Sequence, residues 1–265
     1  MTTTTLAHTE TQTADRADSP RPARLPASRA RRLARIAGGL YLVIFVCGLF
    51  SEVIVRSSII ELGDPATTTQ NLLDASGLFR LGFLTDLTMV VADVATAVLI
   101  YVLLAPVNRT VSLAAAAFRL VQSAVLGANL LHHLMAVQLL EGDGLLGGYT
   151  TEQRDSLVLQ SLETHRFGYF IALVFFAVHL VLLGWLVHRS GYLPRWLGWL
   201  LGAAAAGYLA DSLWFFVSPG YDGAFSPLVL APALVAELSL LLWLLIRGID
   251  IDWRDDRGWA QPTSS

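Results

Sequence analysis

The chain has 265 residues, of which 54% are hydrophobic and only 15% charged, and its formal net charge at pH 7 is −3. Soluble domains usually carry about 25% charged residues, so this composition argues against a soluble globular fold. All 18 basic residues are arginine, which excludes chemistry that needs a lysine Schiff base, and the small net charge gives no reason to expect a nucleic-acid partner.

The first 32 residues form a tail rich in Thr, Ala, Pro and Arg without hydrophobic periodicity, which predicts disorder. The stretch before the first apolar run is too long for a secretory signal, and no small-residue cleavage site follows it. Arginines at positions 29, 31, 32 and 35 crowd the predicted membrane edge. We therefore expect residues 1–32 to be a disordered basic tail on the cytoplasmic side.

Six apolar stretches follow, and each can cross a hydrocarbon layer of about 30 Å, which takes about 20 helical residues. Backbone groups find no water partner inside lipid, so each stretch must be a helix. The predicted spans cover residues 34–55, 81–104, 112–140, 167–187, 195–217 and 227–247. The fold class predicted is an all-α polytopic membrane protein, a bundle of six transmembrane helices over residues 33–247, with a short cytoplasmic tail at residues 248–265.

Arginine placement predicts the orientation of this bundle. With a cytoplasmic N-terminus, thirteen arginines lie on the cytoplasmic side and one lies inside a span. Four lie on the other side, at positions 56, 80, 154 and 166. This bias follows the positive-inside rule, and an even number of spans returns the C-terminus to the same side. We expect both termini in the cytoplasm.

The connecting loops carry local helix signals. Asp64 followed by Pro65 is typical of an N-cap and first helical residue, and predicts a short helix through residues 70–73. Thr150 and Gln153 are spaced as a capping box, which predicts a helix that runs on into the fourth span. The loops at residues 105–110 and 188–194 are short, so spans two and three, and spans four and five, should form tight antiparallel hairpins.

Several short runs resemble a known family. They are Gly39-Leu-Tyr41, Glu52-Val-Ile-Val-Arg-Ser57, Gly63-Asp64, Leu78-Phe-Arg80, Asp86-Leu87, the segment from Leu99 to Arg109, Phe118-Arg-Leu-Val-Gln122, Gly191-Tyr-Leu-Pro194, and Gly207-Tyr208 before Asp211. Over roughly residues 33–247 the chain resembles the bacterial membrane proteins grouped as domain of unknown function 4386. The resemblance implies a six-helix inner-membrane protein, and it supplies no activity, ligand, cofactor or catalytic residue.

Polar residues inside the spans are the candidate functional site, because such residues are costly in lipid and usually face a bundle interior. Asp86 and Asp93 are seven residues apart and share a helical face. Arg119, Asn129 and His133 fall on one side of the third span. The candidate residues are Asp86, Asp93, Arg119, Asn129, His133, His179, Asp211 and Glu237.

Helical rise indicates which of these residues meet. Asp93 and Arg119 lie at similar distances from the turn at Pro106, which predicts an intramembrane ion pair between them. The same arithmetic places Asp86 near the level of Asn129 and His133. We expect an outer polar pocket lined by Asp86, Asn129, His133, Asp211 and Glu52. A purely structural role, in which a buried ion pair fixes helix register, stays open.

Other features leave alternatives open. His179 has apolar neighbours, typical of a satisfied core histidine, although a ligand role stays open. Glu237 lies in mid-span without an evident partner. Small residues recur every four positions at Gly198, Gly202, Ala206 and Ala210, a pattern that lets helices approach closely. We expect this seam to pack inside the bundle, with dimerisation as the alternative.

Three functions fit these residues. The first is a small transporter or permeation protein with a polar intramembrane pocket for an unidentified small molecule. The second is a lipid-modifying intramembrane enzyme with zinc bound by Asp86, His133, Asp211 and His179, although their spacing is not diagnostic of a metal site. The third is a non-catalytic membrane interaction protein, which forms homo-oligomers or binds other partners. No phosphate-binding loop, zinc helix or nucleophile elbow is present. We favour transport without a cofactor.

Overall fold

The structure, a computed structural model, describes residues 26–141, 148–218, 220–221 and 226–249. The described residues form helices joined by turns and short loops and contain no strand. In chain order the elements are α1 (Ala27–Leu49), the π-helix η1 (Phe50–Arg56), α2 (Ser57–Ile59), α3 (Pro65–Asp74), α4 (Ser76–Leu104), α5 (Arg109–Glu141), α6 (Thr151–Ser190), α7 (Arg195–Val217), α8 (Ser226–Leu242) and the π-helix η2 (Trp243–Arg247). The predicted all-α class is confirmed.

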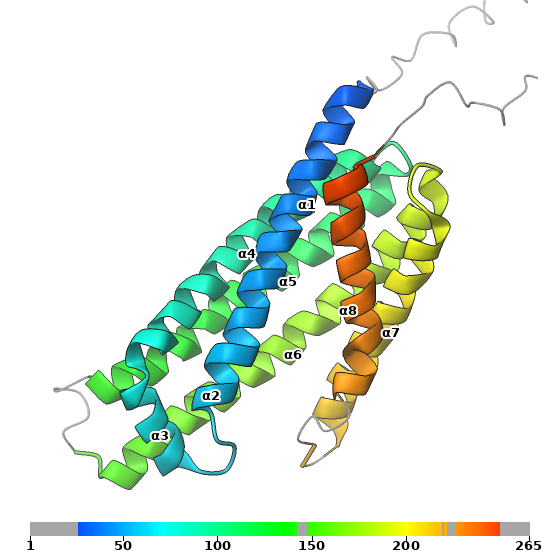
Figure 1. The fold of residues 1–265 in the computed structure, drawn as a ribbon. Coiled ribbons are helices and arrows are strands. Elements are labelled where there is room, and N and C mark those ends of the chain that lie inside the picture. The colour runs from blue at the N-terminus through cyan, green and yellow to red at the C-terminus, as the bar shows by residue number, and fades with distance from the viewer. Residues whose placement is uncertain (1–25, 142–147, 219, 222–225, 250–265) are drawn as a thin grey trace, which may run out of the picture.

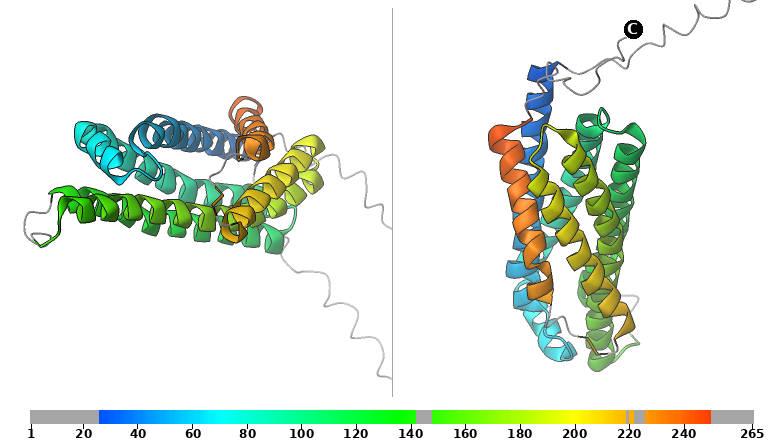
Figure 2. Two further views of the ribbon diagram at one scale, coloured as in Figure 1. Left: turned by 90° about the horizontal axis from the view of Figure 1, so that it is seen from below. Right: turned by 90° about the vertical axis from the view of Figure 1, so that its right-hand side faces the viewer.

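The long helices run up and down the molecule and form one bundle (Figure 1). Successive helices pack as antiparallel neighbours, α4 on α5, α5 on α6, α6 on α7 and α7 on α8, while α1 packs on α4. Both predicted hairpins are confirmed. Figure 2 shows α1 and α8 together on one side of the bundle, with α5 and α6 on the other. Elements far apart in the sequence therefore close the bundle.

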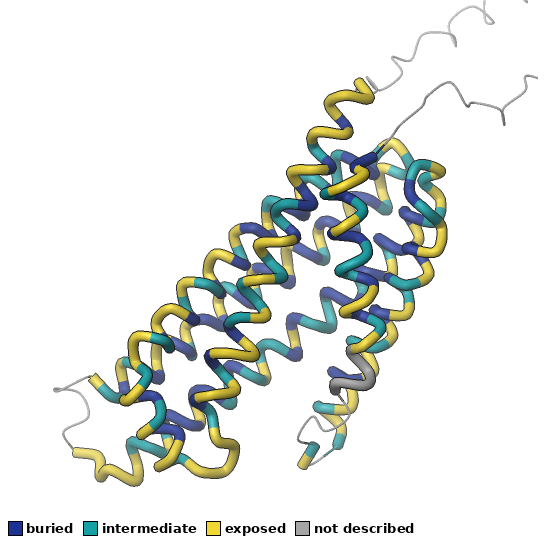
Figure 3. Tube along the Cα trace, viewed as in Figure 1, coloured by how far each residue is buried: buried dark blue, intermediate teal, exposed yellow. Residues whose placement is uncertain are grey.

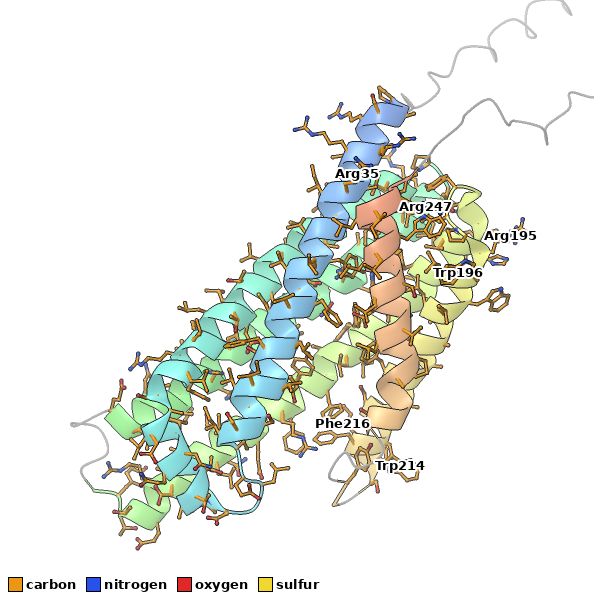
Figure 4. The ribbon with its side chains drawn as sticks, in the orientation of Figure 1. Arg35, Arg195, Trp196, Trp214, Phe216 and Arg247 are labelled. Atoms are coloured by element: carbon orange, nitrogen blue, oxygen red, sulfur yellow. The ribbon has the colours of Figure 1, made fainter. Side chains whose placement is uncertain are left out.

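The ends of the bundle differ in charge. Arg35, Arg195 and Arg247 lie at the end where α1 begins and η2 finishes (Figure 4). We call this the arginine-rich end. Its two turns are tied together, because the Tyr192 hydroxyl donates a 2.7 Å hydrogen bond to the Leu103 carbonyl. At the opposite end α3 folds under the bundle, and we call it the α3 end.

Local signals at the start of α3 and α6 act as predicted. The Asp64 side chain accepts hydrogen bonds from the Thr67 amide at 3.0 Å and the Thr67 hydroxyl at 2.7 Å, and Pro65 is the first helical residue. These bonds stabilise the carboxylate and lower the pKa of Asp64 below its ordinary value. Thr150 and Gln153 form the capping box, and α6 continues from there through the fourth predicted span.

Two helices are longer than the apolar pattern predicts. α1 begins at Ala27, inside the segment expected to be a disordered tail, and Ala30 and Ala34 of its first turns are fully buried. Residues 1–25 lie outside the described part of the chain. α6 has 40 residues and is therefore about 60 Å long, roughly twice the thickness of a hydrocarbon layer.

The part of α6 that precedes the predicted span contributes to a second hydrophobic core at the α3 end. There Leu72 of α3 packs with Ile59, Phe79 and Val158, all of them buried. The main core lies towards the arginine-rich end and joins α1, α6, α7 and α8 through residues such as Leu180.

The outer surface is apolar over most of the bundle's length. Val91, Leu131 and Val181 each expose more than half of their area on helices of the bundle, and Figure 3 shows the exposed residues facing outwards along each helix. Trp196 lies near the arginine-rich end, whereas Trp214 lies near the other end (Figure 4). Aromatic residues at both ends of an apolar surface are typical of a protein surrounded by a lipid bilayer.

Five described helices are long and apolar enough to cross a membrane. They cover Ala27–Ile59, Ser76–Leu104, Arg109–Glu141, Thr151–Ser190 and Arg195–Val217. α8 continues directly into η2. Together they begin one residue before the sixth predicted stretch, at Ser226, and end with it at Arg247.

The prediction that the small-residue seam of α7 packs inside the bundle is correct in part. A Cβ on Gly198 would lie 2.6 Å from the Gly184 carbonyl oxygen of α6, so α6 and α7 touch through bare backbone. The seam does not continue along the predicted row, because Ala206 and Ala210 are exposed whereas Ala204 and Ala205 are buried. The helix is rotated so that only the Gly198 end of the row faces inwards.

Candidate functional site

The buried polar side chains gather in two clusters, named after their central residues. The Arg119 cluster lies within the main core and draws on α1, α4, α5 and α6. The Asp86 cluster lies closer to the α3 end and draws on η1, α4, α5 and α6. Glu237 of α8 lies close enough to Arg119 and Asp93 for its charge to interact with theirs.

Arg119 is the largest charged side chain in the interior and is 1% exposed. Its Nη2 lies 2.5 Å from the Asp93 Oδ1, so the predicted ion pair is present. The second Asp93 oxygen accepts a 2.5 Å hydrogen bond from the Ser123 hydroxyl, and Tyr41 accepts one of the same length from Arg119 Nη1. Each charge is thus paired and hydrogen-bonded, which a buried ion pair needs for stability.

His179 completes the setting of Arg119. A guanidinium only donates hydrogen bonds, so the His179 Nε2, 3.1 Å from Arg119 Nη1, acts as the acceptor. The Nδ1–H then donates to the Ala115 carbonyl at 2.8 Å. The Tyr41 and Phe176 rings lie 4.7 and 5.4 Å from the guanidinium carbon. The structure therefore shows His179 as a hydrogen-bonded core histidine that faces a cation.

Glu237 does have a partner. The Tyr208 hydroxyl of α7 donates a 2.6 Å hydrogen bond to Glu237 Oε1. Both side chains are half-buried, in contrast to the fully enclosed Arg119. Among the described residues no arginine forms an ion pair with Glu237, so this intramembrane carboxyl has only a neutral donor.

Arg56 holds the Asp86 cluster together from the side of η1. Its Nη1 lies 2.7 Å from Asp86 Oδ2, and its Nε lies 2.7 Å from Glu52 Oε2. Asp86 is 3% exposed, while the Glu52 side chain is 66% exposed. The Tyr169 ring of α6 lies 6.0 Å from the Arg56 guanidinium carbon. The ion pairs therefore run from the surface to a buried carboxylate.

Two histidines lie beside Asp86. One nitrogen each of His133 and His165 and one Asp86 oxygen lie within 4.8 Å of one another, and all three residues are buried. His133 Nε2 lies 3.0 Å from the Phe79 carbonyl oxygen, and its ring stacks on the Phe79 ring at 3.8 Å. Asn129 donates a 2.7 Å hydrogen bond to the His165 carbonyl.

Comparison with known proteins assigns the chain to a family. Residues 36–248 match the family described as "Domain of unknown function (DUF4386)". The chain belongs to this family. It is also 30% identical over 163 residues to an "Uncharacterized protein" of Archaeoglobus fulgidus, a match that covers 60% of this chain and 79% of the relative. No solved structure matches.

The sequence correctly predicted several contacts in this DUF4386 protein. Asp93 meets Arg119, and Asp86 lies beside His133. Asn129 joins the same region, although its amide holds the backbone of His165 and not a ligand. Glu52 reaches Asp86 only through Arg56.

Other site predictions need correction. Asp211 accepts a 2.7 Å hydrogen bond from Tyr221, just beyond α7, and is not part of the histidine cluster. His179 belongs to the Arg119 cluster. The four residues proposed to bind zinc are therefore divided among three places in the described structure. Only Asp86 and His133 lie together.

Sequence reasoning missed His165, Arg56, Tyr41 and Tyr208. His165 precedes the predicted fourth span by two residues, in the helix predicted to lead into that span, and so it was not among the polar residues inside the spans. Arg56 was counted as an outer-loop charge. The tyrosines gave a signal, since both lie in runs that resemble the family, but the sequence does not show which buried charge a tyrosine hydroxyl will bond.

Proposed function

We propose that this DUF4386 protein crosses the cytoplasmic membrane of a bacterium six times, with both termini on the cytoplasmic side. α8 and η2 supply the sixth span, since Ser226–Arg247 is long enough to cross the hydrocarbon. Arg35, Arg195 and Arg247 at one end support this orientation. The membrane domain then covers residues 33–247, and residues 1–32 and 248–265 extend into the cytoplasm.

Within this topology we propose a proton-linked transporter or permeation protein, in which Glu237 carries the proton. The observation that supports it is the setting of Glu237, an intramembrane carboxyl that is half-buried and bound only by a neutral hydroxyl. An unpaired charge near the bilayer centre costs about 3 kcal/mol or more, so protonation and deprotonation of such a group have large consequences.

The neighbouring Arg119 cluster strengthens the argument. Asp93 already balances the charge of Arg119, so Glu237 adds a negative charge only when it is ionised. Proton binding at Glu237 then removes one net charge from the bundle interior. A carrier that couples proton movement to a solute needs a group that changes the interior charge in this way.

The Asp86 cluster offers a polar route to Glu237 from the α3 end. Glu52 is exposed and bonds Arg56, whose guanidinium lies over the Tyr169 ring. Tyr169 lies within electrostatic range of Arg56 and of Glu237. Tyr208 then bonds Glu237 directly. Arg56 keeps its charge throughout, so in this proposal Glu52 and Glu237 are the groups that exchange protons, and Arg56 and the two tyrosines line the path between them with hydrogen-bonding groups.

Proton flux into liposomes tests this function. Purified protein is reconstituted with the pH-sensitive dye pyranine inside, and a potassium gradient with valinomycin draws protons inwards, alone and with a panel of small solutes outside. Wild-type protein should acidify the lumen faster than empty liposomes do. Glu237→Gln should reduce the rate to that of empty liposomes, because glutamine carries no exchangeable acid proton.

Glu61→Gln is the matched control, since Glu61 is an exposed carboxyl between α2 and α3. It should retain the wild-type rate. The proposal is wrong if Glu237→Gln and wild type acidify the lumen equally fast, or if wild type never exceeds empty liposomes under any of the solutes.

A further inference from the structure

Asp86, His133 and His165 come from three different helices, α4, α5 and α6, and place one potential ligand atom each within 4.8 Å of the others. We propose that they form a binding site for a divalent transition metal, zinc above all. The site is distinct from Glu237 and does not depend on the transport proposal.

Asp86 has one oxygen committed and one free. Its Oδ2 accepts the hydrogen bond from Arg56 at 2.7 Å. Its Oδ1 is buried and has no hydrogen-bond partner among the described residues. A buried carboxylate oxygen without a partner is costly, and a metal ion would satisfy it. Ligating carboxylates are commonly held through their second oxygen by a neighbouring donor, as Arg56 holds this one.

His133 has one ring nitrogen held by a hydrogen bond and the other available. The Phe79 carbonyl can only accept a hydrogen bond, so His133 Nε2 carries the hydrogen. Nδ1 is left with its lone pair free for coordination. A histidine ligand almost always donates its other nitrogen to a carbonyl or carboxylate, which fixes the tautomer. The stacked Phe79 ring holds the plane of the imidazole in place.

His165 offers an imidazole that nothing else uses. No hydrogen bond joins its ring nitrogens to another residue in the described part of the chain. The residue is only 6% exposed, so bulk water does not readily replace such a partner. Its backbone is held, since Asn129 bonds its carbonyl. Gly168, one turn later, allows this contact, because a Cβ there would collide with the Asn129 amide. The helix is thus fixed close to α5 while the His165 ring stays free.

The types of ligand atom indicate which metal would bind. Two imidazoles and one carboxylate suit zinc, and calcium or magnesium would need six or more oxygen ligands. Zinc bonds of about 2.0–2.1 Å in a tetrahedron put ligand atoms about 3.3 Å apart. The ligand atoms, which lie within 4.8 Å of one another, would therefore have to approach by up to about 1.5 Å through side-chain rotation. Three protein ligands also leave the fourth position open for water or an exogenous group.

Charge favours a cation at this position. The carboxylates of Glu52 and Asp86 outnumber the single guanidinium of Arg56, so the group is negative without a metal. Histidine binds metals as neutral imidazole and adds no charge of its own. A divalent ion compensates the excess carboxylate, although Arg56 limits its affinity by repulsion.

Metal analysis of the purified protein tests the site. Detergent-solubilised protein without an affinity tag is incubated with zinc chloride, dialysed against chelator-free buffer and analysed by mass spectrometry of the metal. We expect about one zinc per chain in wild type. His133→Ala and His165→Ala should each weaken zinc binding by about 100-fold or more, since each removes a ligand. His132→Ala is the control, because His132 neighbours His133 but is not in the cluster, and it should bind like wild type.

Cobalt binding keeps the proposal testable if a histidine variant fails to fold. Cobalt in a tetrahedral site of nitrogen and oxygen ligands gives intense visible absorption, which zinc should abolish by displacement. The proposal is overturned if wild type takes up no zinc and gives no such spectrum. It is equally overturned if folded His133→Ala and His165→Ala variants bind zinc as tightly as wild type does.

Discussion

Replacing Arg119 by methionine should lower the free energy of unfolding by about 3–5 kcal/mol, because the change leaves the Asp93 carboxylate buried without its counter-charge. Arg119 is 1% exposed and Asp93 is 3% exposed, so water cannot replace the lost partner. The measurement is unfolding of the purified protein in mixed micelles with increasing denaturing detergent. The double variant Asp93→Leu/Arg119→Met should recover most of the loss, since it removes both charges.

Arg80 provides the matched control. It forms an ion pair with Glu141 at 2.5 Å, but both side chains are 55% exposed. Arg80→Met should therefore change the free energy of unfolding by no more than about 1 kcal/mol. Equal effects of Arg80→Met and Arg119→Met would show that burial of the Arg119 pair does not matter, and would contradict the arrangement of the Arg119 cluster.

Gly198→Ala should destabilise the bundle by about 1–3 kcal/mol, because the new methyl group has no room. Its Cβ would lie 2.6 Å from the Gly184 carbonyl oxygen, and that oxygen belongs to a helix backbone that cannot rotate away. The helices α6 and α7 would have to separate, which loosens the main core around Leu201. The same unfolding measurement reports the loss.

Gly202 tests whether the effect comes from helix contact and not from loss of a glycine. It lies four residues further along α7, and a Cβ there would meet nothing within 4 Å. Gly202→Ala should be neutral or stabilising by up to about 1 kcal/mol, since alanine favours helix more than glycine does. A loss from Gly202→Ala as large as that from Gly198→Ala would contradict the observed rotation of α7.

Much of the fold was predictable because its signals are local. The Asp64–Pro65 pair and the Thr150 capping box mark helix starts within four residues. Long apolar runs fix helix positions, and Arg195–Val217 matches its predicted range at both ends. The Asp93–Arg119 pair was predictable because a short turn joins α4 and α5, so that residues equally far from the turn lie at equal depth.

The parts that were missed depend on geometry that the sequence does not carry. Tyr208 and Glu237 meet across α7 and α8. Eight residues separate these helices in the sequence, too many for the short-turn calculation that places Asp93 level with Arg119. The rotation of α7 depends on how Gly198 contacts α6. His165 was overlooked because the apolar pattern begins at residue 167, whereas α6 begins at Thr151 and extends well beyond a hydrocarbon layer.

We propose that a bilayer surrounds this bundle, with the arginine-rich end in the cytoplasm and the α3 end outside. Labelling of single cysteines in intact cells with a membrane-impermeant maleimide tests it most directly. Cys47 is the only native cysteine, so Cys47→Ala provides the background. Ala66→Cys and Gln160→Cys, both exposed at the α3 end, should label in intact cells.

Ser28→Cys and Thr110→Cys, exposed at the arginine-rich end, should label only after the cells are lysed. Labelling of Ser28→Cys and Thr110→Cys in intact cells, with Ala66→Cys and Gln160→Cys protected, would contradict the proposed orientation. Recovery of the protein from lysed cells in the soluble fraction without detergent would contradict the membrane assignment itself.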